Sequence, residues 1–391
     1  EEIDFSPETW VSPARVRSAP DPEGVREAAR VLASAARPVI YAGQGVHYAE
    51  AWPQLRELAE LLEAPVTTSL QGKSAFPEDH PLSLGSGGRA VPKPVRWFLD
   101  RSDVIFGIGC SFGATGYGVA MPKGKTVVHA TLDPDDLNLN VPVSVGLAGD
   151  AALTLDALIA ELRSLLPAGG RGRRAAVEAE VAQVQGDWMR EWLPILTSNE
   201  TPMTPYRVIH DLMEAVDVSN TIITHDAGSP RDQLSPFWRP TSPLGYIGWG
   251  KSTQLGYGLG LAMGAKLARP DKLCINVMGD AAIGFTGMDF ETAVRERIPH
   301  LTVVLNNFSM AIELDVMPVS GAKYGSTDIS GNYADMAKAF GGYGERVTDP
   351  AQIKAAVGRA VAATQAGKPA LLEFITSKEQ RFSIYPVGST D

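Results

Sequence analysis

The chain has 391 residues, which is long for one ordinary domain and suits two. Hydrophobic residues make up 44% and charged residues 20%, as in globular proteins with sizeable cores. The net charge of -10 provides no basic surface for nucleic acid, and no apolar run approaches the roughly 20 residues that cross a bilayer. These values argue against nucleic-acid binding and against a membrane-spanning helix.

The cysteines and the N-terminus bear on the compartment. Cys110 and Cys274 each lie in an apolar stretch, and two thiols make neither a disulfide framework nor a zinc site. The first residues lack the basic and apolar regions of a signal peptide. We therefore expect a reducing, cytoplasmic environment.

Helix and strand patterns alternate through the first part of the chain. Asp21 suits the N-cap of the first helix, and Pro22 suits its first position. Strands that alternate with helices predict a doubly wound, mostly parallel sheet of the Rossmann-like type. The expected helices cover 22–36, 49–63 and 151–166, and the expected strands cover 38–42, 65–69, 103–109 and 126–132.

The second part repeats this pattern after a break. A Gly- and Arg-rich run at 167–174 lacks apolar periodicity and indicates a linker. We expect two α/β domains, at 1–170 and 201–391, with a linker and a polar helix at 171–200. The expected helices cover 175–191, 205–216, 255–268, 334–340 and 351–364, and the expected strands cover 221–224, 273–278, 301–305 and 370–375.

The most informative residues close two strands of the second part. Asp280 closes one strand, and Asn307 closes the next, after a stretch long enough for one helix and one strand. Because the carboxyl ends of parallel strands meet at one edge of a sheet, a carboxylate and an amide oxygen are expected side by side. Mg²⁺ prefers oxygen ligands and shares its shell with phosphates. Gly279, Ala281 and Ala282 have little or no side chain, so backbone N–H groups can approach a diphosphate.

This segment resembles the magnesium-diphosphate signature of thiamine-diphosphate (ThDP) enzymes, which is Gly-Asp-Gly followed after one crossover by Asn-Asn. Ala281 stands where the commonest form has a third Gly. That replacement is frequent in the acetolactate-synthase-like branch of the family. The resemblance implies that Asp280 and Asn307 bind Mg²⁺ through their side chains, and Ser309 through its carbonyl.

Further stretches extend the resemblance through the second part. The loop that contains Asp226, Gly228 and Ser229 is similar to the first diphosphate loop of the family. Gln254 and Leu255 match the loop that meets the aminopyrimidine, where a bulky apolar residue props the cofactor in its bent shape. Three residues match the segment near the thiazolium and the substrate: Met310, Ala311 and Ile312.

The first part resembles the central domain of the same family, through stretches at 37–43, 72–81 and 132–134. In members that bind FAD, an Arg follows the Gly-x-Gly strand, whereas this chain has Ser111 there. The sequence therefore argues against FAD and leaves ADP or an acyl-CoA nucleotide open. The Gly-x-Gly at 107–109 lacks the third glycine of a dinucleotide fingerprint, so close packing is its simpler interpretation.

The resemblance also implies a domain that this sequence does not supply. Members carry a pyrimidine-binding domain whose Glu hydrogen-bonds the aminopyrimidine, and proton transfer there needs such a group. We expect a second polypeptide to provide it, in an assembly with two copies of each chain. A clipped product of one longer chain is the alternative.

By resemblance, the activity is that of a ThDP- and Mg²⁺-dependent lyase, decarboxylase or carboligase, similar to acetolactate synthase large subunit or 2-hydroxyacyl-CoA lyase. The substrate would be a 2-oxo acid, an acyloin or a 2-hydroxyacyl-CoA. A nicotinamide-dependent oxidoreductase is a second hypothesis, although it leaves Asp280 and Asn307 unexplained. A non-catalytic subunit that keeps the cofactor fold is the third. Arg231, Glu313 and His225 lie near the expected pocket in sequence, each with a functional or a structural role open.

Overall fold

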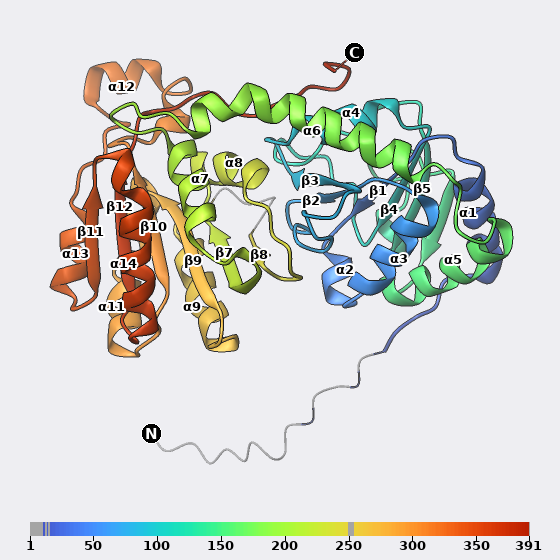
Figure 1. The fold of residues 1–391 in the computed structure, drawn as a ribbon, viewed down its shortest axis with the longest axis horizontal. Helices are drawn as coiled ribbons and strands as arrows, with labels where there is room; N and C mark the ends of the chain where they lie inside the picture. Colours follow the sequence, from blue (N-terminus) through green and yellow to red (C-terminus); the bar gives the residue numbers. More distant parts are fainter. Residues whose placement is uncertain (1–10, 12–13, 15, 249–253, 391) are drawn as a thin grey trace.

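The computed structural model describes residues 11, 14, 16–248 and 254–390. Two six-stranded sheets form two lobes that lie side by side (Figure 1). Every paired strand in both sheets runs parallel to its neighbours, with helices packed against the sheets. The predicted α/β class with two doubly wound sheets is confirmed. No helix of the described residues is both long and apolar enough to cross a membrane.

The first sheet has the strand order β3-β2-β1-β4-β5-β6. The order reverses between β1 and β4, where doubly wound sheets open a crevice for ligands. Its strands are β1 (Pro38–Ala42), β2 (Val66–Ser69), β3 (Ser83–Gly87), β4 (Val104–Ile108), β5 (Thr126–Thr131) and β6 (Val145–Ala148). Its helices are α1 (Pro22–Ser34), α2 (Gly45–Tyr48), α3 (Trp52–Leu62), α4 (Lys93–Arg101) and α5 (Ala151–Leu165), with a 3₁₀ turn at Pro134–Asp136.

Local signals explain which of these elements the sequence predicts. The N-cap of α1 is Asp21, whose carboxylate accepts a hydrogen bond from the Gly24 N–H at 2.8 Å, and Pro22 opens the helix as expected. Sequence analysis missed β3, β6 and α4. Strand β3 consists of Ser, Leu and Gly residues, and Gly is depleted in strands, so its sequence does not predict it.

Helix α6 (Arg174–Leu196) runs along one side of both lobes (Figure 1). It extends beyond the expected end at 191 because Trp192 and Leu196 are buried against the second lobe. The Trp188 ring stacks on Phe237 with centroids 5.0 Å apart. The expected linker at 167–174 leads into this helix, which therefore holds the lobes together as well as connecting them.

The second sheet has the order β11-β12-β10-β9-β7-β8. Its central strands are buried apolar runs, as expected for a parallel sheet covered on both faces. The strands are β7 (Thr221–His225), β8 (Tyr246–Ile247), β9 (Leu273–Gly279), β10 (Leu301–Asn306), β11 (Tyr343–Val347) and β12 (Ala370–Ile375). The helices are α7 (Pro205–Ala215), α8 (Ser229–Phe237), α9 (Tyr257–Ala268), α10 (Asp280–Thr286), α11 (Asp289–Arg295), α12 (Pro318–Tyr324), α13 (Tyr333–Ala339) and α14 (Ile353–Gln365), with 3₁₀ turns at Val218–Asn220, Ala311–Glu313 and Pro350–Gln352.

Strand register decides which loops of this sheet meet. Strand β10 lies between β9 and β12, and Leu305 pairs with Gly279 of β9. Strand β7 pairs with β9 on its other side, with His225 opposite Val277. The loops that follow β7, β9 and β10 therefore lie at one edge of the sheet, as the sequence predicts for Asp280 and Asn307.

Candidate functional site

A cavity of about 250 Å³ opens at this edge of the second sheet. Every predicted site residue lines it except Asp226 and Gln254. The lining residues are Tyr117, Pro205, Ala227, Gly228, Ser229, Pro230, Arg231, Gln233, Leu255, Gly279, Asp280, Ala281, Ala282, Leu305, Asn307, Ser309, Met310, Ala311, Ile312, Glu313 and Thr376. The three loops thus converge on one space.

Asp280 is 2% exposed, and its carboxylate holds the loops after β9 and β10 together. Its Oδ1 accepts a hydrogen bond from the Ala281 N–H at 2.9 Å, and its Oδ2 accepts one from the Ser309 N–H at 3.0 Å. Burial raises the pKa of Asp280 above its usual value, although these two hydrogen bonds oppose the rise. A buried carboxylate in this state gains stability from a nearby cation, so this residue fits a metal ligand.

The turn after β10 gives the two neighbouring asparagines different roles. Asn306 is fully buried, and its side-chain amide donates to the Glu373 carboxylate at 2.7 Å. Its Oδ1 accepts from the Phe308 N–H at 3.0 Å. Phe308 has a φ of 58°, which costs a residue with a side chain about 1–2 kcal/mol. Asn306 therefore stabilises a strained turn, and Asn307 lines the cavity.

Several oxygen atoms that line the cavity are buried and lack a hydrogen-bond partner among the residues that the structure describes. They are Oδ1 of Asn307, the hydroxyls of Ser229 and Ser309, and Oγ1 of Thr376. Buried polar atoms are nearly always satisfied, so each unsatisfied one needs an explanation. Together with Asp280, this set of oxygen atoms fits a divalent cation and a polar ligand.

The first turn of α8 borders the same cavity. Gly228 is its N-cap with a φ of 82°, a conformation that glycine adopts without strain. As a glycine, this N-cap has no side chain, so among the described residues no N-cap side chain accepts a hydrogen bond from the first-turn N–H groups. Such helix N-termini attract anions. Sequence analysis placed Gly228 and Ser229 in a diphosphate loop but did not predict the helix.

Asp226 is fully buried, does not line the cavity, and connects β7 to the start of α9. Its Oδ1 accepts from the N–H groups of Ala227 and Gly256, each at 2.9 Å, and its Oδ2 accepts from the Gly258 N–H at 3.0 Å. Burial raises the pKa of Asp226. The hydrogen bonds from Gly256 and Gly258 to Asp226 therefore hold in place the loop that carries Leu255.

The loop before α9 is described only from residue 254 onward, so Ser252 and Thr253 lie outside the described residues. Gln254 is exposed, and half-buried Leu255 lines the cavity. Helix α9 begins at Tyr257 rather than at 255, because Gly256 has a left-handed φ of 95°.

Two family models match the chain, one in each lobe. The model for the thiamine pyrophosphate enzyme central domain matches residues 25–158, and the model for the C-terminal TPP-binding domain matches 226–374. The chain belongs to the thiamine pyrophosphate (ThDP) enzyme family. The second match contains the cavity loops after β7, β9 and β10.

Relatives of this ThDP-family chain include two kinds of named enzyme. It is 28% identical to a probable acetolactate synthase large subunit from Methanococcus aeolicus, over 94% of this chain and 63% of that protein. It is 29% identical to a sulfoacetaldehyde acetyltransferase from Rhodobacter capsulatus, over 93% of this chain and 65% of that protein. The chain thus spans less than two thirds of the length of these relatives. The crystal structure of benzoylformate decarboxylase from Polynucleobacter necessarius shares the fold, with a TM-score of 0.74 at 20% identity, covering 98% of this chain and 69% of that one.

Four cavity residues of this ThDP-family chain bear on function beyond the predicted cofactor set. Arg231 and Glu313, which sequence analysis left open, both line the cavity. Tyr117 and Thr376 were not predicted. Thr376 follows the carboxyl end of β12, so the strand-end rule could have found it. Tyr117 comes from the first lobe, and nothing in its local sequence connects it to this site.

His225 lies next to the cavity without lining it. It is fully buried, with Nδ1 3.0 Å from the Asp226 carbonyl and 3.0 Å from the Tyr257 hydroxyl. Burial lowers the pKa of His225 to about 4, so the imidazole is neutral near pH 7. These contacts favour the structural role that sequence analysis had left open.

A second cavity, of about 590 Å³, lies in the central domain at the carboxyl ends of β1, β4 and β5. Its charged lining residues, among those described, are Asp133, Asp136 and Asp150. Ser111, which stands at the FAD-arginine position, also lines it. Aspartates offer no positive charge to a nucleotide phosphate, and the expectations about FAD, ADP and CoA stay predictions.

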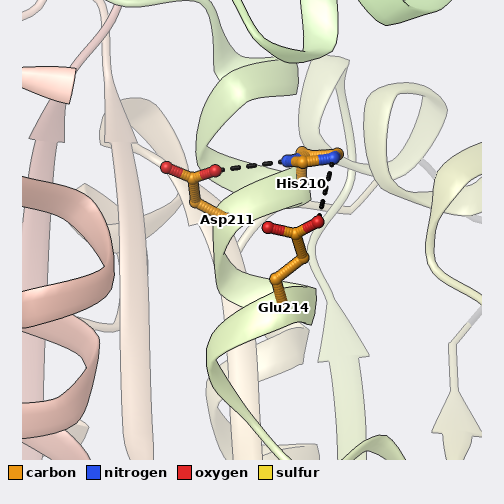
Figure 2. Close-up of side chains that lie close together, drawn as sticks. All are labelled: His210, Asp211 and Glu214. Carbon is orange, nitrogen blue, oxygen red and sulfur yellow. Dashed lines mark hydrogen bonds and ion pairs between the residues drawn. The ribbon is translucent and has the colours of Figure 1, made fainter. Parts of the chain in front are cut away.

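A cluster of His210, Asp211 and Glu214 on α7 has metal-binding residue types, but its geometry indicates an ion-pair network (Figure 2). Nδ1 of His210 lies 3.2 Å from Asp211, and Nε2 lies 3.5 Å from Glu214, so the carboxylates face different edges of the ring. Arg207 pairs with Asp211 at 2.9 Å, and Lys354 of α14 pairs with Glu214. These basic residues already balance the carboxylates, and the cluster lies outside the ThDP-family cavity.

Proposed function

We propose that Asp280, Asn307 and the carbonyl of Ser309 hold a Mg²⁺ ion that binds the diphosphate of ThDP in the cavity of the second lobe. The observation that carries this proposal is the convergence of the loops after β9 and β10. It brings a buried carboxylate with a raised pKa to the same space as an unsatisfied amide oxygen. Mg²⁺ requires hard oxygen ligands of this kind and shares its shell with phosphate oxygens.

The rest of the loops fit the remainder of the cofactor. The uncapped start of α8, at Gly228 and Ser229, provides backbone N–H groups for the diphosphate. The small residues Gly279, Ala281 and Ala282 leave room for the diphosphate to approach the backbone. Leu255 props the cofactor rings, with Gln254 beside it, and Asp226 holds that loop through Gly256 and Gly258. Met310, Ala311 and Ile312 form the wall on the substrate side.

We propose that the reaction is the lysis, decarboxylation or ligation of a C–C bond next to a carbonyl, in a 2-oxo acid, an acyloin or a 2-hydroxyacyl-CoA. ThDP, when bound, would supply a nucleophilic carbon for this chemistry, and the protein would supply placement and electrostatics. In this chain, Asp280 and Asn307 fix the anionic end of the cofactor. The apolar side chains of Leu255, Met310 and Ile312 exclude water from the reacting end.

The group that deprotonates the cofactor is proposed to lie outside this chain. A pyrimidine-binding domain with an activating Glu would complete the site, either on a separate subunit in an assembly of two copies of each chain or on a further segment of the same polypeptide. The relatives extend well beyond the matched region, which is consistent with such a domain.

Two measurements test the proposal. Calorimetry of this chain with ThDP should show binding that depends on Mg²⁺ and is lost on addition of EDTA. A fully metal-independent affinity, or binding of NADH in place of ThDP, contradicts the site. Addition of a pyrimidine-domain polypeptide should then give turnover of pyruvate. Cofactor binding without turnover in the completed assembly favours the non-catalytic alternative.

A further inference from the structure

Glu373 is a fully buried acid on β12 of the second sheet, and it is not among the residues that line the ThDP-family cavity. In the sheet it pairs with Val304 of β10 on one side and with Arg346 of β11 on the other. Burial of a charged carboxylate is costly unless the group is paired and hydrogen-bonded. An acid at this position therefore requires an explanation from its contacts.

Four hydrogen bonds satisfy both oxygens of this carboxylate. Oε1 accepts from Nδ2 of Asn306 at 2.7 Å and from Nη2 of Arg346 at 2.8 Å. Oε2 accepts from the Ala334 N–H and from Nε of Arg346, each at 3.0 Å. An ionised carboxylate has about four acceptor sites, so these partners fill Glu373 completely. Any effect of Glu373 on the cavity therefore passes through the groups that it holds.

One of these groups belongs to the loop after β10. Asn306 donates to Glu373 and also supports the turn that follows it, because its Oδ1 accepts from the Phe308 N–H at 3.0 Å. Phe308 has a left-handed φ of 58°, so the turn depends on this support. The same turn carries Asn307 and Ser309, which are proposed metal ligands. Glu373 thus fixes the course of this loop.

A second group belongs to the start of α13. Glu373 accepts from the Ala334 N–H in the first turn of that helix. Arg346, the bidentate partner of Glu373, also donates from Nη2 to the Gly331 carbonyl at 2.9 Å, just before the helix begins. Bidentate arginine–carboxylate pairs fix orientation strongly. Glu373 and Arg346 together therefore hold the first turn of α13 in place.

That turn reaches the loop after β9 through Tyr333. Tyr333 is 8% exposed, and its ring belongs to the apolar cluster that contains Met278 and Ile283. Its hydroxyl donates a hydrogen bond shared between the carbonyls of Asp280 at 3.1 Å and Ser330 at 3.2 Å. Asp280 is the proposed carboxylate ligand of the metal. One buried acid thus connects the two loops that carry the proposed ligands.

We propose that Glu373 is a positioning residue, whose contacts set the spacing between the metal ligands of the two loops and so select Mg²⁺. This inference rests on the proposed function and adds the reason for the choice of cation. Mg²⁺ demands nearly ideal octahedral geometry with oxygens at about 2.0–2.1 Å, whereas Ca²⁺ accepts a flexible shell at about 2.3–2.6 Å. Loops held rigidly by one hydrogen-bonded acid favour the smaller and stricter ion.

The test titrates Mg²⁺ or Ca²⁺ into the full chain with excess ThDP and measures each Kd by calorimetry. Glu373→Gln keeps the size of the side chain but leaves one acceptor oxygen, so it loosens both loops. We expect its Kd for Mg²⁺ to rise by about 10- to 100-fold, the usual effect of changing a residue that orients metal ligands. Its Kd for Ca²⁺ should rise by about threefold or less, because Ca²⁺ tolerates a flexible shell.

Tyr333→Phe separates positioning from folding, since it removes one hydroxyl and keeps the ring in the core. The Asp280 carbonyl then loses one hydrogen bond, and the Kd for Mg²⁺ should rise by about 2- to 10-fold. The Kd for Ca²⁺ should again rise less than that for Mg²⁺, because only the strict octahedral shell depends on the lost spacing.

Two matched controls lie outside the cavity lining. Tyr206→Phe removes a hydroxyl that donates to the Arg381 carbonyl at 2.6 Å from a fully buried ring. Asp211→Asn neutralises a buried carboxylate that pairs with Arg207 at 2.9 Å. Both controls lower stability by the same chemistry as the test variants. Neither should change the ratio of the Kd for Mg²⁺ to the Kd for Ca²⁺.

A rise confined to Mg²⁺ in the two test variants supports the proposal. An equal rise for both cations in Glu373→Gln overturns it, because Glu373 would then serve folding alone, and so does an unchanged Kd for Mg²⁺. If Glu373→Gln fails to fold, Tyr333→Phe decides by the same criterion. A changed ratio in either control also overturns the proposal. A wild-type chain that binds ThDP without a divalent cation, or does not bind it, defeats the proposed function itself.

Discussion

Replacement of Asp280 by Asn removes the negative charge of the proposed metal site at almost unchanged size. In the structure, each carboxylate oxygen accepts one backbone N–H, from Ala281 at 2.9 Å and from Ser309 at 3.0 Å. An amide has one acceptor oxygen, so one of these contacts, worth about 1.5–3 kcal/mol with a charged acceptor, is lost. Removal of a carboxylate whose pKa is raised by burial recovers part of that cost. Without cofactor, we therefore expect Tm to change by about 5 °C or less.

Cofactor binding should change much more. Mutation of residues that merely orient metal ligands costs about 10- to 100-fold in affinity, so loss of a ligand should cost at least about 100-fold. With ThDP and Mg²⁺ at about 1,000 times the wild-type Kd, the wild-type chain gains about 4.1 kcal/mol of stability. A variant that binds about 100-fold more weakly gains about 1.4 kcal/mol at the same concentration. The rise in Tm on addition of cofactor should fall to about one third.

Thermal unfolding with and without ThDP and Mg²⁺ measures both effects. Asp103→Asn is a matched control, because its two carboxylate oxygens also accept backbone N–H groups, from Ala36 and Arg37, but in the first lobe. The control should keep the full cofactor-induced rise. An Asp280→Asn variant that keeps the full Mg²⁺-dependent rise would refute the assignment of this carboxylate as a metal ligand.

Three further predictions concern two buried histidines, a close-packed glycine and half-buried Leu255. Burial lowers the pKa of His225 and of His300 to about 4, so the unfolded chain, with its histidines near 6.5, binds more protons than the folded chain between these values. The free energy of unfolding should therefore fall by on the order of 3 kcal/mol for each histidine as the pH drops from about 6.5 to about 4. Urea unfolding measures it across this range, and a free energy that does not change with pH would contradict the reasoning. Gly258→Ala places a Cβ 2.4 Å from Oδ1 of Asn276 and 2.7 Å from the His225 carbonyl, so it should lower the free energy of unfolding by about 1–3 kcal/mol in denaturant titrations. The control Gly260→Ala meets open space and should leave that free energy unchanged or raise it. Leu255→Ala should lower kcat more than it lowers the affinity for ThDP, whereas Leu255→Met should keep activity. If steady-state kinetics show no loss of kcat for the Ala variant, Leu255 does not support the cofactor rings.

Much of the candidate site was predictable because its residues follow strand ends. Parallel strands direct their carboxyl ends to one edge, so a polar residue at such an end can be placed from sequence periodicity alone. The structure brings Asp280 and Asn307 into one cavity on this principle. The neighbouring Asn306 does not line this cavity, because its side chain is buried and donates a hydrogen bond to Glu373. Which of the two asparagines faces the cavity depends on the direction in which each side chain leaves the strained turn.

Elements with weak local signals escaped prediction. Helix α8 contains two prolines, and the short strand β8 has two residues, so neither carries a clear periodicity. Helix α6 continues past the expected end because tertiary burial of Trp192 stabilises its last turns.

From sequence alone, this chain could be recognised as two parallel α/β domains with a diphosphate-type signature, since those features depend on local periodicity and on spacing within one crossover. The tertiary structure decided that Asp226 holds a loop, that the cavity carries Arg231 as a lining cation, and that Tyr117 of the other lobe packs against it. The contact between Tyr117 and Arg231 joins residues more than one hundred positions apart, and only the packing of the two lobes brings them together.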